Sequence, residues 1–120
     1  MKQYQIGEFE EIVLLAVGIL NGKAYGVAIK EEIKKRIDRE VSIGALQVTL
    51  RRLEKKGFLE SSHGESGQAR GGRPKLFFEI TMEGRNALVY TKECRNSLWS
   101  FIPQVFYKIF SLSYERTFST

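Results

Sequence analysis

Residues 42–57, SIGALQVTLRRLEKKG, decide the fold of this 120-residue chain. Apolar residues recur here at spacings of three, four and three positions, a pattern typical of a helix with one buried face. They are Ile43, Leu46, Leu50 and Leu53. Ser42 is placed to cap the N-terminus of this helix, and Gly57 is placed to end it. The segment is therefore expected to be a short amphipathic helix.

The opposite face of this predicted helix suits DNA better than water. With about 100° between successive residues, it carries Gly44, Ala45, Val48, Arg51, Arg52 and Lys55. Small residues near the N-terminus allow a close approach to base edges, and basic residues further along lie where phosphates pass. The N-terminal end at Ser42 itself attracts a phosphate. Gln47 and Thr49 flank this face, and Gln47 either pairs with an adenine edge or contacts only phosphate or water.

Two more helices are predicted upstream. Residues 6–20 are almost wholly apolar after three glutamates, which favour a helix N-terminus, and Asn21-Gly22 ends the helix. Over residues 27–39, an isoleucine recurs at every fourth position from Ile29, which is typical of a surface helix with one buried side. We therefore expect a deeply buried first helix and an amphipathic second one.

A two-stranded hairpin and a last helix are predicted downstream. The strands are residues 58–63 and 75–80, and the glycine-rich loop between them carries Arg70 and Arg73, with Lys75 next to it. Thr81 is placed to cap a long helix that runs to about Ile102 and is interrupted by Pro103.

This order predicts a winged helix-turn-helix, mainly α with a small β-hairpin wing, followed by a long C-terminal dimerisation helix. In that fold the third helix enters the major groove of DNA, and the wing reaches an adjacent groove or the backbone. The expected domains are residues 1–81 for DNA binding and residues 82–120 for dimerisation.

The net charge of +5 is concentrated in the same region. Residues 41–75 contain seven basic and three acidic side chains, whereas residues 1–40 sum to zero and residues 76–120 to +1. A focused basic patch favours a polyanionic partner, although a solvated helix face is the alternative.

Five short motifs resemble the PadR family of bacterial regulators. They are Leu14-Leu15, Ala24-Tyr25-Gly26, the run from Gly44 to Gly57, Gly71-Gly72-Arg73-x-Lys75, and Thr81-x-x-Gly84-x-x-x-Leu88. The resemblance implies a dimeric transcriptional repressor, often released by a small aromatic or drug-like ligand. Tyr25 is expected to be one of the DNA-binding residues. The family usually has tyrosine, which commonly touches the DNA backbone, where this chain has Gln47.

Other classes of function are less well supported. The one histidine, His63, is expected far from Cys94, and the sequence shows no carboxylate pair, metal cluster or Ser-His-Asp set, so no enzyme, metal or cofactor is expected. A winged-helix module that binds only protein remains an alternative, as does a DNA-binding protein without a ligand. The apolar run Ile12–Leu20 is about half of a membrane span and follows glutamates, so a cytoplasmic protein is expected and membrane contact is not favoured.

The last predicted helix carries a stripe that suits a homodimer. Its residues follow a 4-3-4-3 spacing: Ala87, Thr91, Cys94, Leu98 and Phe101, bordered by Leu88, Trp99 and Ile102. A second copy of the chain would cover this stripe, and the alternative is that the stripe packs onto the first helix of the same chain. A two-fold symmetric dimer would bind a palindromic operator in double-stranded DNA. Two copies of Trp99 would sandwich a small aromatic effector, or else Trp99 is ordinary packing.

Overall fold

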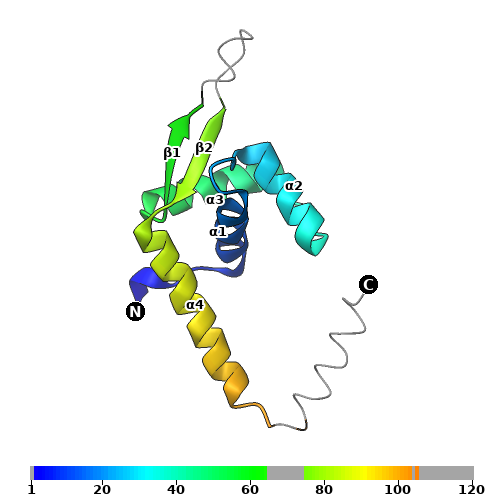
Figure 1. Ribbon diagram of the computed structural model, residues 1–120, viewed down its shortest axis with the longest axis vertical. Coiled ribbons are helices and arrows are strands. Elements are labelled where there is room, and N and C mark those ends of the chain that lie inside the picture. The colour runs from blue at the N-terminus through cyan, green and yellow to red at the C-terminus, as the bar shows by residue number, and fades with distance from the viewer. Residues whose placement is uncertain (1, 65–74, 104, 106–120) are drawn as a thin grey trace.

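The computed structural model describes residues 2–64, 75–103 and 105, and it contains every predicted helix and strand. The elements are a 3-10 turn η1 (Lys2–Tyr4), α1 (Glu8–Leu20), α2 (Gly26–Ile37), α3 (Ile43–Lys55), β1 (Leu59–His63), β2 (Leu76–Ile80) and α4 (Met82–Ser100). Helix α1 lies between the other elements, the hairpin stands at one end, and α4 projects from the opposite end (Figure 1). The predicted fold class, a mainly helical winged helix-turn-helix, is confirmed.

Both predicted N-caps are present. The Ser42 hydroxyl accepts a hydrogen bond from the Ala45 amide at 3.1 Å, and the Thr81 hydroxyl accepts one from the Gly84 amide at 3.0 Å. Each side chain satisfies a helix N–H that has no partner within the helix, and this fixes where α3 and α4 begin.

The core forms where α1, α2 and α3 meet under the hairpin. Leu46, Leu50 and Leu53 of α3 are fully buried, as the sequence pattern predicted. Ile43 was wrongly expected in this stripe: it is exposed, because it is the first residue of α3 and extends beyond the packed turns. Thr49 takes a place in the core instead, with 5% of its surface exposed.

The hairpin is attached to the body by main-chain bonds. Strands β1 and β2 are antiparallel, with Leu59 opposite Ile80 and His63 opposite Leu76. The Phe78 amide donates to the Ala24 carbonyl at 2.8 Å, so the loop before α2 borders β2 like a short third strand. These bonds to β2 therefore set the position of the hairpin. The predicted DNA-binding residues Arg70 and Arg73 lie outside the described residues.

Helix α4 has two different halves. Gly84 and Ala87 in its first half are buried, and Leu88 packs against the core. The expectation that Ala87 contacts a partner is wrong, because this side chain is completely buried within its own protomer. In contrast, Leu98 and Phe101 near the C-terminal end are 72% and 82% exposed, so this end of α4 leaves large apolar side chains uncovered.

Candidate nucleic-acid interface

One face of α3 is open to solvent along its whole length, and we call it the α3 face. Its residues are the six predicted ones: Gly44, Ala45, Val48, Arg51, Arg52 and Lys55. Thr49 does not belong to it, because its side chain is buried, and the expectation that it contacts DNA is therefore wrong. The exposed Val48, between the small residues and the basic ones, gives this face an apolar centre that suits a thymine methyl group.

Gln47 lies at the edge of the α3 face, against the start of α2. It is half-buried, and its amide nitrogen lies 3.4 Å from the point where a Cβ on Gly26 would stand. The first turns of α2 and α3 therefore form one continuous surface, with the Gln47 amide between them.

The basic residues of the α3 face form no ion pair with a carboxylate, in contrast to five other cations of the described chain. Lys34, Arg36, Arg39, Lys56 and Arg95 each form an ion pair. Among the residues that the structure describes, no ion pair involves Arg51, Arg52, Lys55 or Lys75. Their charges are therefore available to phosphates.

Tyr25 and Lys75 meet at the base of the wing. The Lys75 ammonium lies 4.1 Å from the centre of the Tyr25 ring, and the Phe77 ring packs edge-on against the same ring at 5.6 Å. Tyr25 is also the N-cap residue of α2. The structure thus brings together two predicted DNA-binding residues that are 50 positions apart in the sequence, beside the start of α2.

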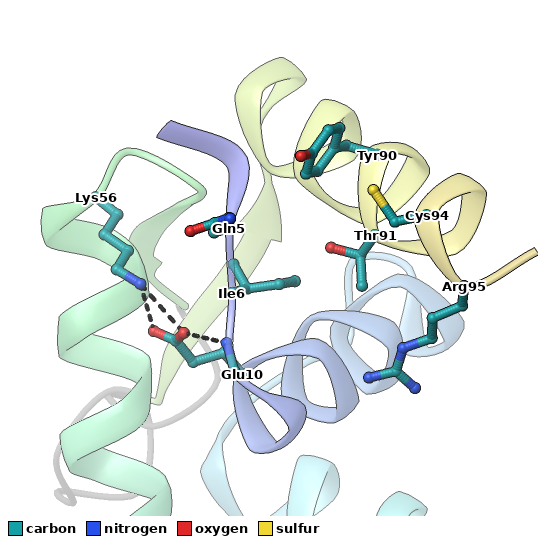
Figure 2. A pocket seen from close by; sticks show the side chains of 9 residues that line it. Gln5, Ile6, Glu10, Lys56, Tyr90, Thr91, Cys94 and Arg95 are labelled. Carbon is teal, nitrogen blue, oxygen red and sulfur yellow. Dashed lines mark hydrogen bonds and ion pairs between the residues drawn. The ribbon is translucent and has the colours of Figure 1, made fainter. Parts of the chain in front are cut away.

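Lys56 was counted with the basic patch, but its charge is neutralised inside the protein. Its ammonium donates to both carboxylate oxygens of Glu10, at 2.8 and 3.1 Å, and the Gly7 amide donates to the same carboxylate at 2.8 Å (Figure 2). Burial would raise the pKa of Glu10, but these hydrogen bonds and the charges of Lys56 and Arg52 outweigh it and hold the pKa below its usual range.

The first turn of α1 connects three other parts of the protein through its glutamates, and we call it the acidic turn. Glu8 pairs with Arg39 after α2 at 2.9 Å, Glu10 with Lys56 after α3 at 2.8 Å, and Glu11 with Arg95 of α4 at 2.8 Å. In the sequence, these glutamates indicated only the N-terminus of a helix. Two adjacent residues of α1 thus link the end of α3 to α4.

A groove of about 580 Å³ lies beside the acidic turn, between the segment before α1 and α4. Thr91 and Cys94 line it (Figure 2), and the Thr91 hydroxyl donates to the Ala87 carbonyl at 2.8 Å. Thr91 is half-buried against its own protomer, whereas Cys94 is exposed beside the groove. The exposed part of the stripe is therefore at Cys94, Leu98 and Phe101.

Replacement of Glu10 by glutamine is expected to lower the free energy of unfolding by about 2 kcal/mol at neutral pH, the usual worth of hydrogen bonds to a charged group. Because its pKa is lower in the folded chain, Glu10 contributes stability above its unfolded pKa of about 4.3 and loses it as the pH falls through the folded value. Urea unfolding should show the gap between wild type and Glu10→Gln narrowing in acid. The exposed Glu31→Gln is the control, and a gap independent of pH would contradict the expectation.

Two other features are absent from the described ranges. No three His, Cys, Asp or Glu side chains are grouped there so that they could hold a metal ion. None of the described helices combines the length and the apolar content that a bilayer crossing requires.

Comparison with known proteins gives one family. Residues 14–89 match the model of the Transcriptional regulator PadR-like family. Among curated proteins, no sequence matches the chain.

Solved structures with the same fold support this match. A complex structure of hsRosR, the RosR protein of H. salinarum, is 23% identical over 97% of this chain and 94% of that one, with a TM-score of 0.67. A PadR-like transcription factor from Bacteroides fragilis is 25% identical over 77% and 84%, with a TM-score of 0.64. A PadR family regulator from Clostridium difficile is 28% identical over 85% and 98%, with a TM-score of 0.57.

Proposed function

The chain belongs to the PadR-like family of transcriptional regulators, and from this membership we propose that it is a homodimeric repressor that binds a palindromic operator in double-stranded DNA. In this proposal, residues 1–81 bind DNA and residues 82–120 dimerise, in the cytoplasm. The chain acts by occupying DNA and not by catalysis.

The observation that carries the proposal is the α3 face. It combines small residues at the N-terminal end with three cations that form no ion pair within the described residues. A recognition helix needs this arrangement, because small residues admit base edges while cations hold the phosphates on either side. Lys75 and Tyr25 extend the same positive region to the wing, and Ser42 places the N-terminus of α3 beside it.

Selection from random duplex DNA tests the proposal. We expect an inverted repeat whose half-sites are about 34 Å apart, or a multiple of that, because a two-fold symmetric dimer presents two copies of α3. Enrichment of a single half-site would argue against the dimer. If no duplex is enriched, and binding to random DNA does not weaken with salt, a protein-interaction module is the better description.

Gln47→Ala is expected to change which bases are preferred without much loss of affinity for random DNA. A glutamine that pairs with adenine contributes about 1–3 kcal/mol of discrimination, whereas a residue that touches only phosphate contributes equally to all sequences. The measurement compares the selected operator, operators with single changes, and scrambled DNA. An equal loss of affinity for all of these DNAs would show that Gln47 does not recognise a base.

Release by a small planar aromatic ligand is the second part of the proposal. Trp99 lies on the outer half of α4, near Leu98 and Phe101, where a partner would bring a second tryptophan. A ligand between the two rings would change the separation of the two copies of α3, and so the affinity for the operator. Trp99 is the one tryptophan of the chain, so its fluorescence reports binding directly. Planar aromatic cations should quench it and weaken DNA binding; quenching with unchanged DNA affinity would make Trp99 an ordinary interface residue.

A further inference from the structure

The N-terminal half of the α3 face carries no side chain that can form a hydrogen bond with a base. Gly44, Ala45 and Val48 are exposed there, and their side chains contain no nitrogen or oxygen. The Ser42 hydroxyl before them accepts a hydrogen bond from the Ala45 amide and serves as the cap of α3. Because the N-terminal residues of a recognition helix are those that contact base edges, this composition restricts how the protein can read DNA.

Val48 lies in the middle of the α3 face and is open to the solvent. Its side chain is 52% exposed, and no heavy atom lies within 4 Å of the place where a Cβ on Gly44, one turn earlier, would stand. Water alone does not favour a valine here, because valine is a weaker helix former than the charged residues that usually occupy the exposed side of a helix. An exposed valine beside an open space suits a surface that packs against another apolar group.

The major groove of DNA offers one apolar group to such a surface. Every base pair presents hydrogen-bond donors or acceptors there, and thymine adds a methyl group at C5. Gln47, the hydrogen-bonding side chain of the same turns, is half-buried at the edge toward Gly26 and does not lie at the centre. The side chains at the centre therefore distinguish bases by contact with a methyl group.

The basic half of the α3 face holds the helix in the groove for this contact. Arg51 and Arg52 follow Val48 by three and four residues, one turn along the same face, and form no ion pair within the described residues. Their contacts to phosphates fix the position of the helix without reading the sequence. From Gly44 to Val48 the helix rises about 6 Å, against about 3.4 Å between base pairs, so the apolar half covers about two base pairs.

We propose that Val48, with Gly44 and Ala45 beside it, reads the C5-methyl groups of pyrimidines in the DNA site, so that 5-methylcytosine is accepted in place of thymine. The methyl contact rests on the DNA binding of the proposed function, but it needs neither the homodimer nor a ligand. Thymine and cytosine differ in their hydrogen-bonding groups, whereas thymine and 5-methylcytosine share the methyl group. Binding therefore responds to the methylation of cytosine at these positions.

Base analogues at single positions of the selected operator test the methyl contact with the full-length protein. Thymine against uracil, and 5-methylcytosine against cytosine, are two matched pairs, because the members of each pair differ only in the methyl group. At the positions that face Val48, we expect each methyl group to raise the affinity about fourfold, the usual effect of burying one such group. If uracil binds like thymine and 5-methylcytosine like cytosine, the hydrogen-bonding groups are read instead, and the proposal is overturned.

Val48→Ala assigns the contact to this residue. The variant should reduce the preference for the methylated member of both pairs to below about twofold, since the buried apolar area is lost. Its affinity for random duplex should not change, and alanine preserves α3 because it is the better helix former. Val89→Ala is the control, because Val89 is an exposed valine on α4, and it should keep the fourfold preference. A preference that survives Val48→Ala contradicts the assignment.

Two outcomes distinguish a failure of the methyl contact from a failure of the proposed function. An operator that binds equally well with uracil in place of every thymine refutes the methyl contact alone, because a specific DNA site has still been found. A selection that enriches no sequence refutes the recognition of an operator, and the methyl contact with it.

Discussion

A chain in which Arg51 and Lys55 are both replaced by alanine is expected to bind duplex DNA about 100-fold more weakly than the wild type at moderate salt. Both side chains are exposed on the C-terminal half of the α3 face, and neither forms an ion pair within the part of the chain that the structure describes. Each charge-assisted contact to a phosphate is worth about 1.5 kcal/mol, which is roughly tenfold in affinity. Because no internal pair is broken, the loss should appear in binding and not in stability.

The dependence on salt distinguishes lost phosphate contacts from other damage. Each contact contributes about 0.9 to the slope of log affinity against log salt, so the double variant should lower the slope by about two units. Random-sequence duplex is sufficient for this titration, because the electrostatic part of binding does not depend on the operator. Lys35→Ala with Lys92→Ala is the matched control, with the same loss of charge from exposed positions on α2 and α4. An equal loss in the control would show that net charge, and not the α3 face, holds the DNA.

Local signals in the sequence were sufficient for the helices and their starts. Ser42 and Thr81 were recognised as N-caps because the hydrogen bond each makes spans only three residues. The leucine stripe of α3 was recognised for the same reason, since its period is a property of the helix alone. Ile43 and Thr49 were misplaced because the limit of the core depends on where α1 and α2 end, which the pattern within α3 does not contain.

Contacts between distant residues were not predictable in this way. Glu10 and Lys56 are 46 positions apart, and nothing in either local sequence shows that they meet. Lys56 therefore counted as part of the DNA-binding charge until the structure showed its carboxylate partner. The stripe on α4 poses the same problem: apolar spacing shows that Ala87 is covered, but not whether its own protomer or a partner covers it.

Gly84→Ala is expected to destabilise the protein by about 3 kcal/mol, the upper end of the cost of overpacking a core. A Cβ at this position would overlap the carbonyl oxygen of Phe58 and would lie 3.0 Å from Ile80 Cγ2. The Phe58 carbonyl cannot retreat freely, because it accepts a hydrogen bond from the Thr81 amide at 3.1 Å. Thr81 in turn donates to the Gly57 carbonyl at 2.5 Å, so the start of α4 is fixed against the end of α3. The better helix propensity of alanine, about 1 kcal/mol, is too small to offset this overlap.

Thermal unfolding of Gly84→Ala should show a midpoint lower by about 15 °C. Sedimentation should also show that the proposed dimer is weaker, because α4 must move away from the Phe58 carbonyl. Gly44→Ala is the control, because its expected effect on stability has the opposite sign. No heavy atom lies within 4 Å of a Cβ at Gly44, so alanine there should stabilise α3 by about 0.5 kcal/mol through a less flexible unfolded chain. The same methyl group would stand on the α3 face and hinder close approach to the bases, so Gly44→Ala should be more stable and yet bind the operator less well. If Gly84→Ala instead unfolds at the wild-type temperature, α4 is free to shift at its base, and the spacing of the two copies of α3 in the proposed dimer must be set by the far end of α4 alone.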